Sequence, residues 1–327
     1  MKLALFILLA LHATISKAFR SMTTMNRGFE PLESYLDSLG SSTTPPTTPP
    51  TPPTPPTSPT HSTTTTLKLN ILKMGAFLDR GQSFNPTSGS YYHSDMQTAR
   101  HYIEELVATQ QNSPKPLELL NGEWQLVFSS VSHGLFRSSP FFLAVQEAFK
   151  KGAETEAFGQ DKAQLFFKLH ELQTCSWGVS KIGRIAQRID TSSNTLYSEF
   201  DTSLLSLTVF PLIGWAKMFP TFGGSVITKS DIKNYDEQSG KLSLQVDFTA
   251  SQKVEGLPDL GDFVRKIKVP VGAIWKLLPW NSGRPATCTL TNVYLDDDFR
   301  VSIDVDGEYF CYTRPLVERQ PYQNKTY

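Results

Sequence analysis

Short segments in which apolar and polar residues alternate dominate the chain from residue 119 onward. In the first of them, residues 119–130, every second side chain is large and apolar: Trp124, Leu126 and Phe128. This period of two is typical of a β-strand that is buried on one face. Gly122 precedes the alternation and lets the chain turn into the strand.

The same period recurs in later segments, which are separated by residues typical of turns. It predicts strands at residues 181–189, 196–200, 204–210, 225–235, 242–248, 287–295, 300–305 and 308–313. The clearest apolar face is that of Leu242, Leu244, Val246 and Phe248. About eight or nine strands joined by short turns favour a mainly β fold, a closed antiparallel β-barrel of about eight strands, because closure removes the exposed edges of an open sheet.

Helical spacing appears on both sides of the first strand. Ser94 opens a capping box, which predicts that an N-terminal helix begins there and packs on the barrel. Pro140 predicts the start of a second helix, which Gly152 is expected to end. Apolar residues predict a third helix at residues 161–172. The second and third helices are expected to form a helical cap insert over one end of the barrel.

The N-terminal region is expected to be a targeting sequence. Residues 1–18 have the charged start, short apolar run and small residues of a signal peptide, and the run is too short to span a bilayer. Residues 19–40 are rich in hydroxyl groups and begin without acidic residues, as transit peptides do. The Ala18-Phe19 junction resembles the two-part leader of plastid proteins in algae with secondary plastids, which implies import into a plastid (chloroplast) through the secretory route. An ordinary secretory leader, and therefore a secreted protein, is the alternative.

The rest of the chain divides by composition. Residues 41–66 are almost wholly Thr, Pro and Ser, which cannot bury a core, and are expected to form a disordered spacer. Residues 67–93 are treated as an ambiguous linker, in which the apolar residues of 67–79 are compatible with a short helix but have no clear period. Residues 94–315 carry the predicted helices and strands of one domain, and residues 316–327 are expected to be a flexible tail.

Charge, cysteine content and motifs narrow the function classes. The chain has 31 basic and 31 acidic residues, so no net charge attracts nucleic acid. Cys288 and Cys311 lie in predicted strands, where they either pair or stay as buried thiols. The sequence has no nucleophile elbow, phosphate loop or dinucleotide motif, so no enzyme activity, cofactor or metal is predicted. The acidic run at residues 296–298 is typical of a turn, although it would also suit acid/base or calcium chemistry.

Three segments, at residues 120–130, 182–190 and 294–302, together resemble the plastid lipid-associated proteins, also called fibrillins or plastoglobulins. They stand in the family's order, and the resemblance covers about residues 94–314. It implies a lipocalin-like barrel that binds or stores isoprenoid lipids on plastid lipid bodies and thylakoids and protects against stress. The insert at residues 134–172 is longer than in simple members, which leaves the ligand open.

Gly122 and Trp124 also resemble the Gly-x-Trp pattern of lipocalin first strands. In lipocalins a C-terminal Arg packs across this indole and closes the barrel floor, which implies that Arg300 is the partner of Trp124 here. A guanidinium stacked on an indole stabilises a protein by about 0.5–2 kcal/mol.

An eight-stranded barrel either has room for one small apolar ligand or is packed with side chains. If the apolar faces of the strands point inward, the residues that line the cavity or the packed core are Trp124, Leu126, Phe128, Leu242, Leu244, Val246 and Phe248. Burial of apolar surface, which contributes about 25 cal/mol per Å², would then bind a carotenoid, a quinone or another isoprenoid.

Residues 210–222 are the most apolar stretch after the leader, but they are too short and too interrupted by Pro and Gly to cross a membrane. They predict either a buried crossover or a loop that docks on a membrane or lipid body through Phe210, Trp215, Met218, Phe219 and Phe222. The sequence as a whole favours a non-enzymatic protein that binds or coats hydrophobic lipids at plastoglobules or thylakoids. An enzyme that modifies an isoprenoid lipid inside the barrel and a secreted lipid carrier are the alternatives.

Overall fold

The structure of the chain is a computed structural model. It describes residues 61–82, 89–131, 135–153, 180–204, 209–210, 216–217, 222–252, 268–276 and 283–317. The predicted leader, most of the Thr/Pro spacer, the predicted third helix and most of the predicted tail lie outside these residues.

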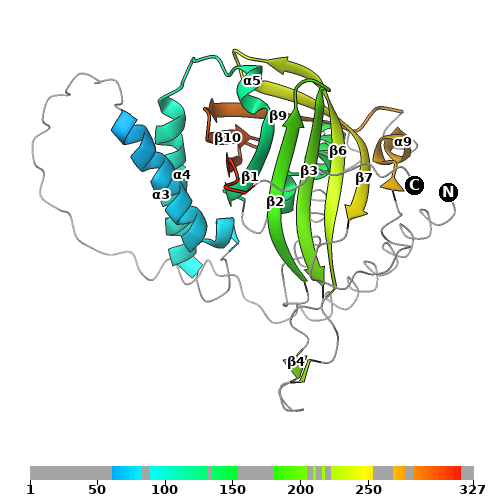
Figure 1. Cartoon of the computed structure of the whole chain (residues 1–327), viewed down its shortest axis with the longest axis horizontal. Coiled ribbons are helices and arrows are strands. Elements are labelled where there is room, and N and C mark those ends of the chain that lie inside the picture. The colour runs from blue at the N-terminus through cyan, green and yellow to red at the C-terminus, as the bar shows by residue number, and fades with distance from the viewer. Residues whose placement is uncertain are drawn as a thin grey trace, which may run out of the picture. The chain divides into compact units, whose positions relative to one another are not determined.

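Eight antiparallel strands form a ring of hydrogen-bonded neighbours (Figure 1). The order is β6-β3-β2-β1-β11-β10-β9-β7, and the pairing of β7 with β6 joins the two ends. The eight strands are β1 (Gly122–Ser129), β2 (Ser180–Asp190), β3 (Thr195–Leu204), β6 (Phe222–Asp236), β7 (Lys241–Gln252), β9 (Thr287–Leu295), β10 (Phe299–Ile303) and β11 (Tyr309–Thr313). The predicted mainly β fold with about eight antiparallel strands is therefore confirmed.

The described segments contain three further strands, each only two residues long. β8 (Lys268–Val269) pairs with β7, and β4 (Val209–Phe210) pairs with β5 (Ala216–Lys217) in a separate sheet. Of the strand predicted at residues 204–210, Leu204 belongs to β3 and Val209–Phe210 form β4, while residues 205–208 lie outside the described residues.

Local hydrogen bonds and one glycine shape the connections between strands. In the turn after β2, the Asp190 carboxylate accepts hydrogen bonds from the hydroxyls of Ser192 (2.6 Å) and Ser193 (2.7 Å), which lower the pKa of Asp190 to about 2. Between β6 and β7, Gly240 has φ +70°, and a Cβ there would lie 2.1 Å from the carbonyl oxygen of Asn292. Glycine therefore allows this turn to lie against β9.

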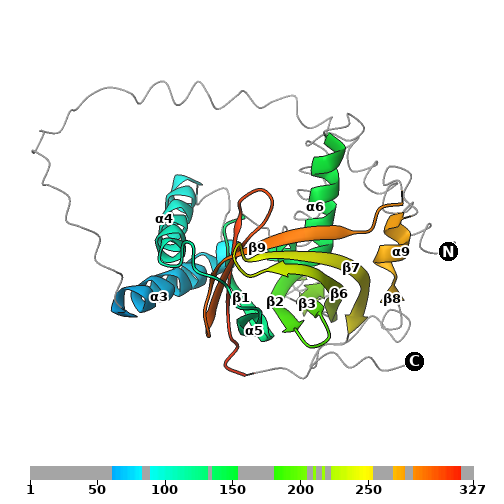
Figure 2. The ribbon, with the colours of Figure 1, turned by 90° about the horizontal axis from the view of Figure 1, so that it is seen from above.

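Two helices cover the outer face of the ring at β1, β9, β10 and β11 (Figure 2). They are α3 (His61–Phe77) and α4 (Gly89–Ala108), and the short helix η1 (Asp79–Gly81) follows α3. The side chains buried between these helices and the strands form one group, which we call the outer cluster. It consists of Leu67, Ile71, Leu78, Tyr92, Met96, Ala99, Ile103, Leu106, Phe128, Tyr294, Phe299, Val301 and Cys311.

These helices correct three predictions about the N-terminal part of the domain. α3 begins inside the expected spacer and runs through the first part of the expected linker, residues 67–93, as far as Phe77. α4 begins at Gly89, so Ser94 does not cap it; the carbonyl of Ser94 accepts a hydrogen bond from the Thr98 hydroxyl inside the helix. Packing on the sheet stabilises α3, whose apolar residues follow no clear helical stripe, so the sequence period did not reveal it.

The inside of the ring holds a second group of buried side chains, which we call the inner cluster. η2 (Leu135–Ser138) and α6 (Pro140–Ala153) contribute to it together with the strands, so the predicted second helix packs against the ring, while the predicted cap over one end stays a prediction. α6 runs one residue past Gly152, which was expected to end it. Members of the inner cluster include Leu120, Trp124, Leu126, Leu135, Phe136, Phe142, Leu143, Ile185, Ile189, Leu196, Leu242, Leu244, Val246, Cys288, Leu290, Phe310 and Tyr312.

A β-bulge in β1 moves one predicted inward residue to the outer face. The register of β1 with β11 shifts between Leu126 and Phe128. Leu126 belongs to the inner cluster, whereas Phe128 packs in the outer cluster against the helices. The expectation that Phe128 lines the inside of the ring is therefore wrong, because a bulge breaks the period of two.

A second bulge, in β7, has the same effect. Val246 pairs with Ser230, but Phe248 pairs with Lys229, so Asp247 is an extra residue between them. Phe248 therefore shares the outer face with Lys229, whose Nζ lies 6.0 Å from the ring centroid of Phe248. Phe248 is buried there, and its predicted place on the inner face is wrong.

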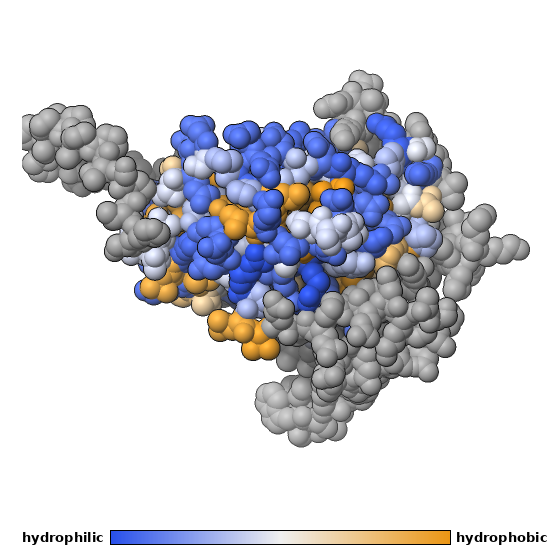
Figure 3. Space-filling model, turned by 45° about the horizontal axis from the view of Figure 1, so that its top comes forward, coloured by the Kyte–Doolittle hydropathy of each residue, from blue (hydrophilic) through white to orange (hydrophobic). Residues whose placement is uncertain are grey.

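The described surface is mainly polar. The face shown in Figure 3 is largely hydrophilic, with apolar side chains visible only in small groups between polar ones. The exposed large apolar residues of the described segments are Leu69, Phe77, Tyr91, Leu316 and Val317. In those segments no helix has the length and apolar character that a membrane crossing requires.

Replacement of Gly75 by Ala should destabilise the protein, although Gly to Ala inside a helix is normally favourable. A Cβ at Gly75 would lie 2.5 Å from the carbonyl oxygen of Val127, so α3 would have to move away from β1. We expect urea denaturation to show a loss of about 1–3 kcal/mol. The control K73A, at an exposed position of the same helix, should change stability by less than about 0.5 kcal/mol. A more stable G75A variant would contradict this close approach.

Candidate functional site

The most unusual group inside the ring is the guanidinium of Arg300. Along β10, Phe299 and Val301 pack in the outer cluster, so Arg300 between them points inward. Its side chain is 1 % exposed, and its Cζ lies 5.2 Å from the ring centroid of Trp124 and 4.1 Å from that of Tyr312. The contact between Arg300 and Trp124 that the sequence predicts is therefore present.

Hydrogen bonds fix the Arg300 side chain from across the ring. Its Nη2 donates to Oε1 of Gln187 on β2 at 2.5 Å. Gln187 Nε2 in turn donates to the carbonyl of Ser138 (2.9 Å) and to the hydroxyl of Tyr312 (3.1 Å). This network joins β10, β2, β11 and η2, so it holds the guanidinium in one orientation.

Arg300 carries its charge without an acidic partner in the described part of the chain. Burial lowers the pKa of Arg300 to about 10, so the guanidinium stays protonated at neutral pH. Two aromatic rings and one amide oxygen surround it, and none of these groups carries a negative charge: burial raises the pKa of Tyr312 to about 12. A buried cation is costly unless it is paired, so this arrangement calls for a compensating group.

Other polar atoms on the inner face also lack partners. Nε of Arg300 and the hydroxyls of Ser198 and Ser230 are buried, and none has a hydrogen-bond partner among the described residues. Ser198 on β3 stands opposite Gln187, and Ser230 on β6 stands opposite Val246. The inner faces of β2, β3 and β6 therefore each carry a buried polar side chain among the apolar residues of the inner cluster.

A second arginine, which the sequence analysis missed, also contacts Trp124. The Cζ of Arg314 lies 3.8 Å from the indole centroid, closer than that of Arg300. Arg314 donates hydrogen bonds to the carbonyls of Leu119 and Asn121, both at 2.7 Å. Arg314 therefore ties the end of the last strand to the segment that leads into β1, the closing role that the sequence analysis assigned to Arg300.

The Trp124 indole completes this closure. Its Nε1 donates to the carbonyl of Leu120 at 2.9 Å, so the three consecutive carbonyls from Leu119 to Asn121 are all bound by Trp124 or Arg314. These residues are the end of α5 (Leu117–Leu120) and its C-cap, where helix carbonyls lack partners within the helix. Gly122 has φ +100°, and a Cβ there would lie 2.9 Å from Nη1 of Arg314. The position of Arg314, directly after the last alternating segment, was the signal that could have identified it.

The other predicted ligand-lining residues divide between the two faces. Trp124, Leu126, Leu242, Leu244 and Val246 lie in the inner cluster, where ligand contact stays a prediction. Phe128 and Phe248 lie on the outer face, as described above, and so cannot line the interior.

The predicted docking segment is only partly described. Phe210 ends β4 and Phe222 begins β6, while Trp215, Met218 and Phe219 lie outside the described residues. Membrane or lipid-body docking through this segment therefore stays a prediction.

The acidic run at residues 296–298 acts as a turn and as an anchor for α3. The Asp296 carboxylate accepts hydrogen bonds from the backbone N–H groups of Asp298 (3.2 Å) and Phe299 (2.9 Å). Lys68 of α3 forms ion pairs of 2.6 Å with both Asp296 and Asp298. Within the described segments, no group of three or more potential metal ligands occurs.

Cys288 and Cys311 do not pair. Both are buried, and they lie on opposite faces of the ring, Cys288 in the inner cluster and Cys311 in the outer cluster, so they form no bond with each other. Burial raises the pKa of the Cys311 thiol, so this thiol is unreactive at neutral pH.

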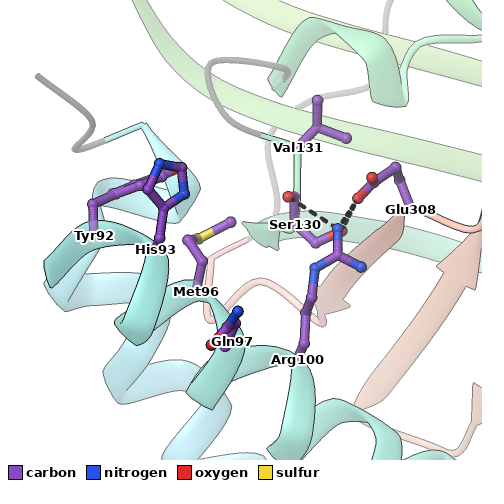
Figure 4. Close-up of a pocket in the computed structure, with 8 residues that line it drawn as sticks. All are labelled: Tyr92, His93, Met96, Gln97, Arg100, Ser130, Val131 and Glu308. Atoms are coloured by element: carbon purple, nitrogen blue, oxygen red, sulfur yellow. Dashed lines mark hydrogen bonds and ion pairs between the residues drawn. The ribbon is translucent and has the colours of Figure 1, made fainter. Parts of the chain in front are cut away.

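A pocket of about 720 Å³ lies outside the ring, between α4 and the ends of β1 and β11 (Figure 4). Arg100 of α4 forms an ion pair with Glu308 and a hydrogen bond of 3.4 Å with the carbonyl of Ser130. Glu308 also accepts a hydrogen bond of 2.5 Å from the Ser130 hydroxyl. The charges of Arg100 and Glu308 therefore neutralise each other at one side of this pocket.

Comparison with protein-family models, with curated proteins and with solved structures finds no match for this chain. The resemblance to plastid lipid-associated proteins therefore stays a prediction from the sequence, and the function has to be inferred from the geometry of the ring.

Replacement of Arg314 by Ala should open the closed end of the ring. The change removes the stacking on Trp124 and leaves the carbonyls of Leu119 and Asn121 without their donors. We expect a loss of about 2–4 kcal/mol in the free energy of unfolding, measured with urea. R314K keeps the charge but not the planar fork, and should recover less than half of that loss. Full stability of R314A would show that Arg314 does not close the ring.

Proposed function

We propose that the protein binds a hydrophobic lipid inside a lipocalin-like barrel formed by the eight-stranded ring. The observation that carries this proposal is the inner cluster, in which apolar side chains from strands around the whole ring face one region. An eight-stranded barrel of this kind can hold one small ligand. Removal of an apolar chain from water provides the driving force, at about 25 cal/mol per Å².

The resemblance to plastid lipid-associated proteins supports a place for this binding at plastoglobules or thylakoids. On this proposal the ligand is an isoprenoid such as a carotenoid or quinone, or another lipid of the plastid, and the protein coats or protects lipid surfaces. The Ala18-Phe19 junction supports plastid import, and a secreted lipid carrier is the alternative. Glycans on the Thr/Pro segment of the native protein, found by mass spectrometry, would favour the secreted form.

The polar network around Arg300 is the one observation that favours an enzyme instead. General acid/base catalysis requires a group whose pKa lies near the working pH. Burial leaves Arg300 with a pKa of about 10 and Tyr312 with one of about 12, so both keep their protons near neutral pH. The remaining members of the network, Gln187 and the Ser138 carbonyl, do not titrate. The network is therefore better suited to holding a polar group of the ligand than to moving a proton.

The binding proposal is tested by purifying the full chain from a lipid-rich host. Any bound lipid is then removed by solvent extraction and identified by mass spectrometry. We expect one class of lipid at about one molecule per chain. L244F fills part of the interior and should lower the lipid content, at a cost of about 1–3 kcal/mol in stability that circular dichroism can follow. L69A, at an exposed position of α3, should carry as much lipid as the natural chain. A folded protein without lipid would contradict the proposal.

The predicted docking segment has its own test. The double variant W215S/F219S should move the protein from the floating lipid fraction of a density gradient to the soluble fraction, because shallow insertion depends on large apolar side chains. The control L316S/V317S removes two exposed apolar residues outside the segment and should float like the natural chain. Equal flotation of all three proteins would contradict docking through residues 210–222.

A further inference from the structure

Three buried donor groups on the inner face of the ring have no acceptor in the described part of the chain. They are Nε of Arg300 and the hydroxyls of Ser198 and Ser230. Buried polar atoms in native proteins almost always have a partner, and an unpaired cation is the costliest exception. A single partner for all three would have to accept several hydrogen bonds and carry negative charge.

We propose that the ligand is an amphipathic organic acid of the fatty-acid class, whose carboxylate binds Arg300 beside Ser198 and Ser230. This inference rests on the proposed lipid binding and narrows it from neutral isoprenoids to acids. An ionised carboxylate has two oxygens with about four lone-pair sites and no donor, so it suits three donors and one positive charge. A guanidinium binds a carboxylate through two parallel hydrogen bonds, which is stronger than its bonds to neutral oxygens.

The geometry of the network prepares Arg300 for this role. Gln187 holds Nη2 of Arg300, while Tyr312 and the Ser138 carbonyl hold Gln187, so the guanidinium is fixed before a ligand arrives. The unpaired Nε remains for the ligand. A fixed donor costs less entropy on binding than a mobile one.

The surrounding residues suit an apolar chain attached to the carboxylate. Ser198 is the register neighbour of Gln187 on the adjoining strand, so its hydroxyl lies on the same inner face. Ser230 stands opposite Val246, which is followed on the inner face of β7 by Leu244 and Leu242. An acyl chain that runs along this face of β7 would thus contact the apolar side chains of Val246, Leu244 and Leu242.

Buried water molecules are the competing explanation for the unpaired donors. Water can satisfy two or more of them, because buried water usually bonds to otherwise unpaired polar groups. Water alone would leave the charge of Arg300 uncompensated, and it would give no preference for an acid over its ester. That preference is therefore the measurement that distinguishes the two explanations.

The experiment compares dodecanoic acid with methyl dodecanoate on the full chain at pH 8, through displacement of an uncharged fluorescent apolar probe. The acid should bind at least about ten-fold more tightly than the ester, as expected for a charge-assisted pair. R300M should abolish this preference and leave ester affinity within about three-fold, since the apolar contacts remain. S198A/S230A should reduce the preference by about three- to ten-fold while retaining part of it. R100M, which removes an arginine outside the ring, should keep the full preference.

Each contrary result has a separate meaning. Equal affinity of the natural chain for acid and ester would overturn the carboxylate site and leave lipid binding standing. Displacement by neither compound would overturn lipid binding in the ring as well. If R300M does not fold, the acid/ester ratio of the natural chain and of S198A/S230A decides, and an unchanged ratio in the serine variant would overturn the roles of Ser198 and Ser230.

Discussion

The structure depends on one aromatic side chain at the closed end of the ring. The Trp124 indole contacts the guanidinium groups of Arg300 and Arg314 and donates its N–H to the carbonyl of Leu120. Arg314 follows the last strand and Trp124 lies in the first, so their contact joins the two ends of the chain segment that forms the ring. A β-sheet closes only when its first and last strands are held in register, and this cluster fixes both with side-chain bonds beyond the backbone ladder.

The same strands build two separate cores because their side chains alternate. On β10, Phe299 and Val301 pack outward under α3 and α4, while Arg300 points inward. The helices are therefore part of the same packed fold. They cover the outer faces of β1, β10 and β11, which would otherwise expose aromatic and β-branched side chains to water. This double burial explains why the strands near Trp124 are rich in apolar residues at consecutive positions and depart from a strict period of two.

The period of two was enough to predict most strands and the inward position of Leu244 and Val246, because both lie in regular stretches. It failed at Phe128 and Phe248, since a single extra residue in a bulge reverses the face and leaves no signal in the apolar pattern. α3 was foreseen only as a short helix without a clear period, because its stability comes from packing on the sheet, which local propensity does not contain. Arg314 was overlooked in favour of Arg300, although its position directly after the last alternating segment could have identified it.

The position of Arg300 inside the ring bears on which chemical class of ligand the interior would select. An apolar interior alone selects weakly, because carotenoids, quinones and acyl chains all gain similar free energy from burial. Selection arises where a ligand satisfies groups that would otherwise stay unpaired, since the wrong ligand then leaves their desolvation uncompensated. In this ring those groups are a guanidinium fixed by Gln187 and two serine hydroxyls. A negatively charged acceptor would satisfy all of these groups. The specificity of the interior therefore comes from its few polar side chains, and its affinity comes from the many apolar ones.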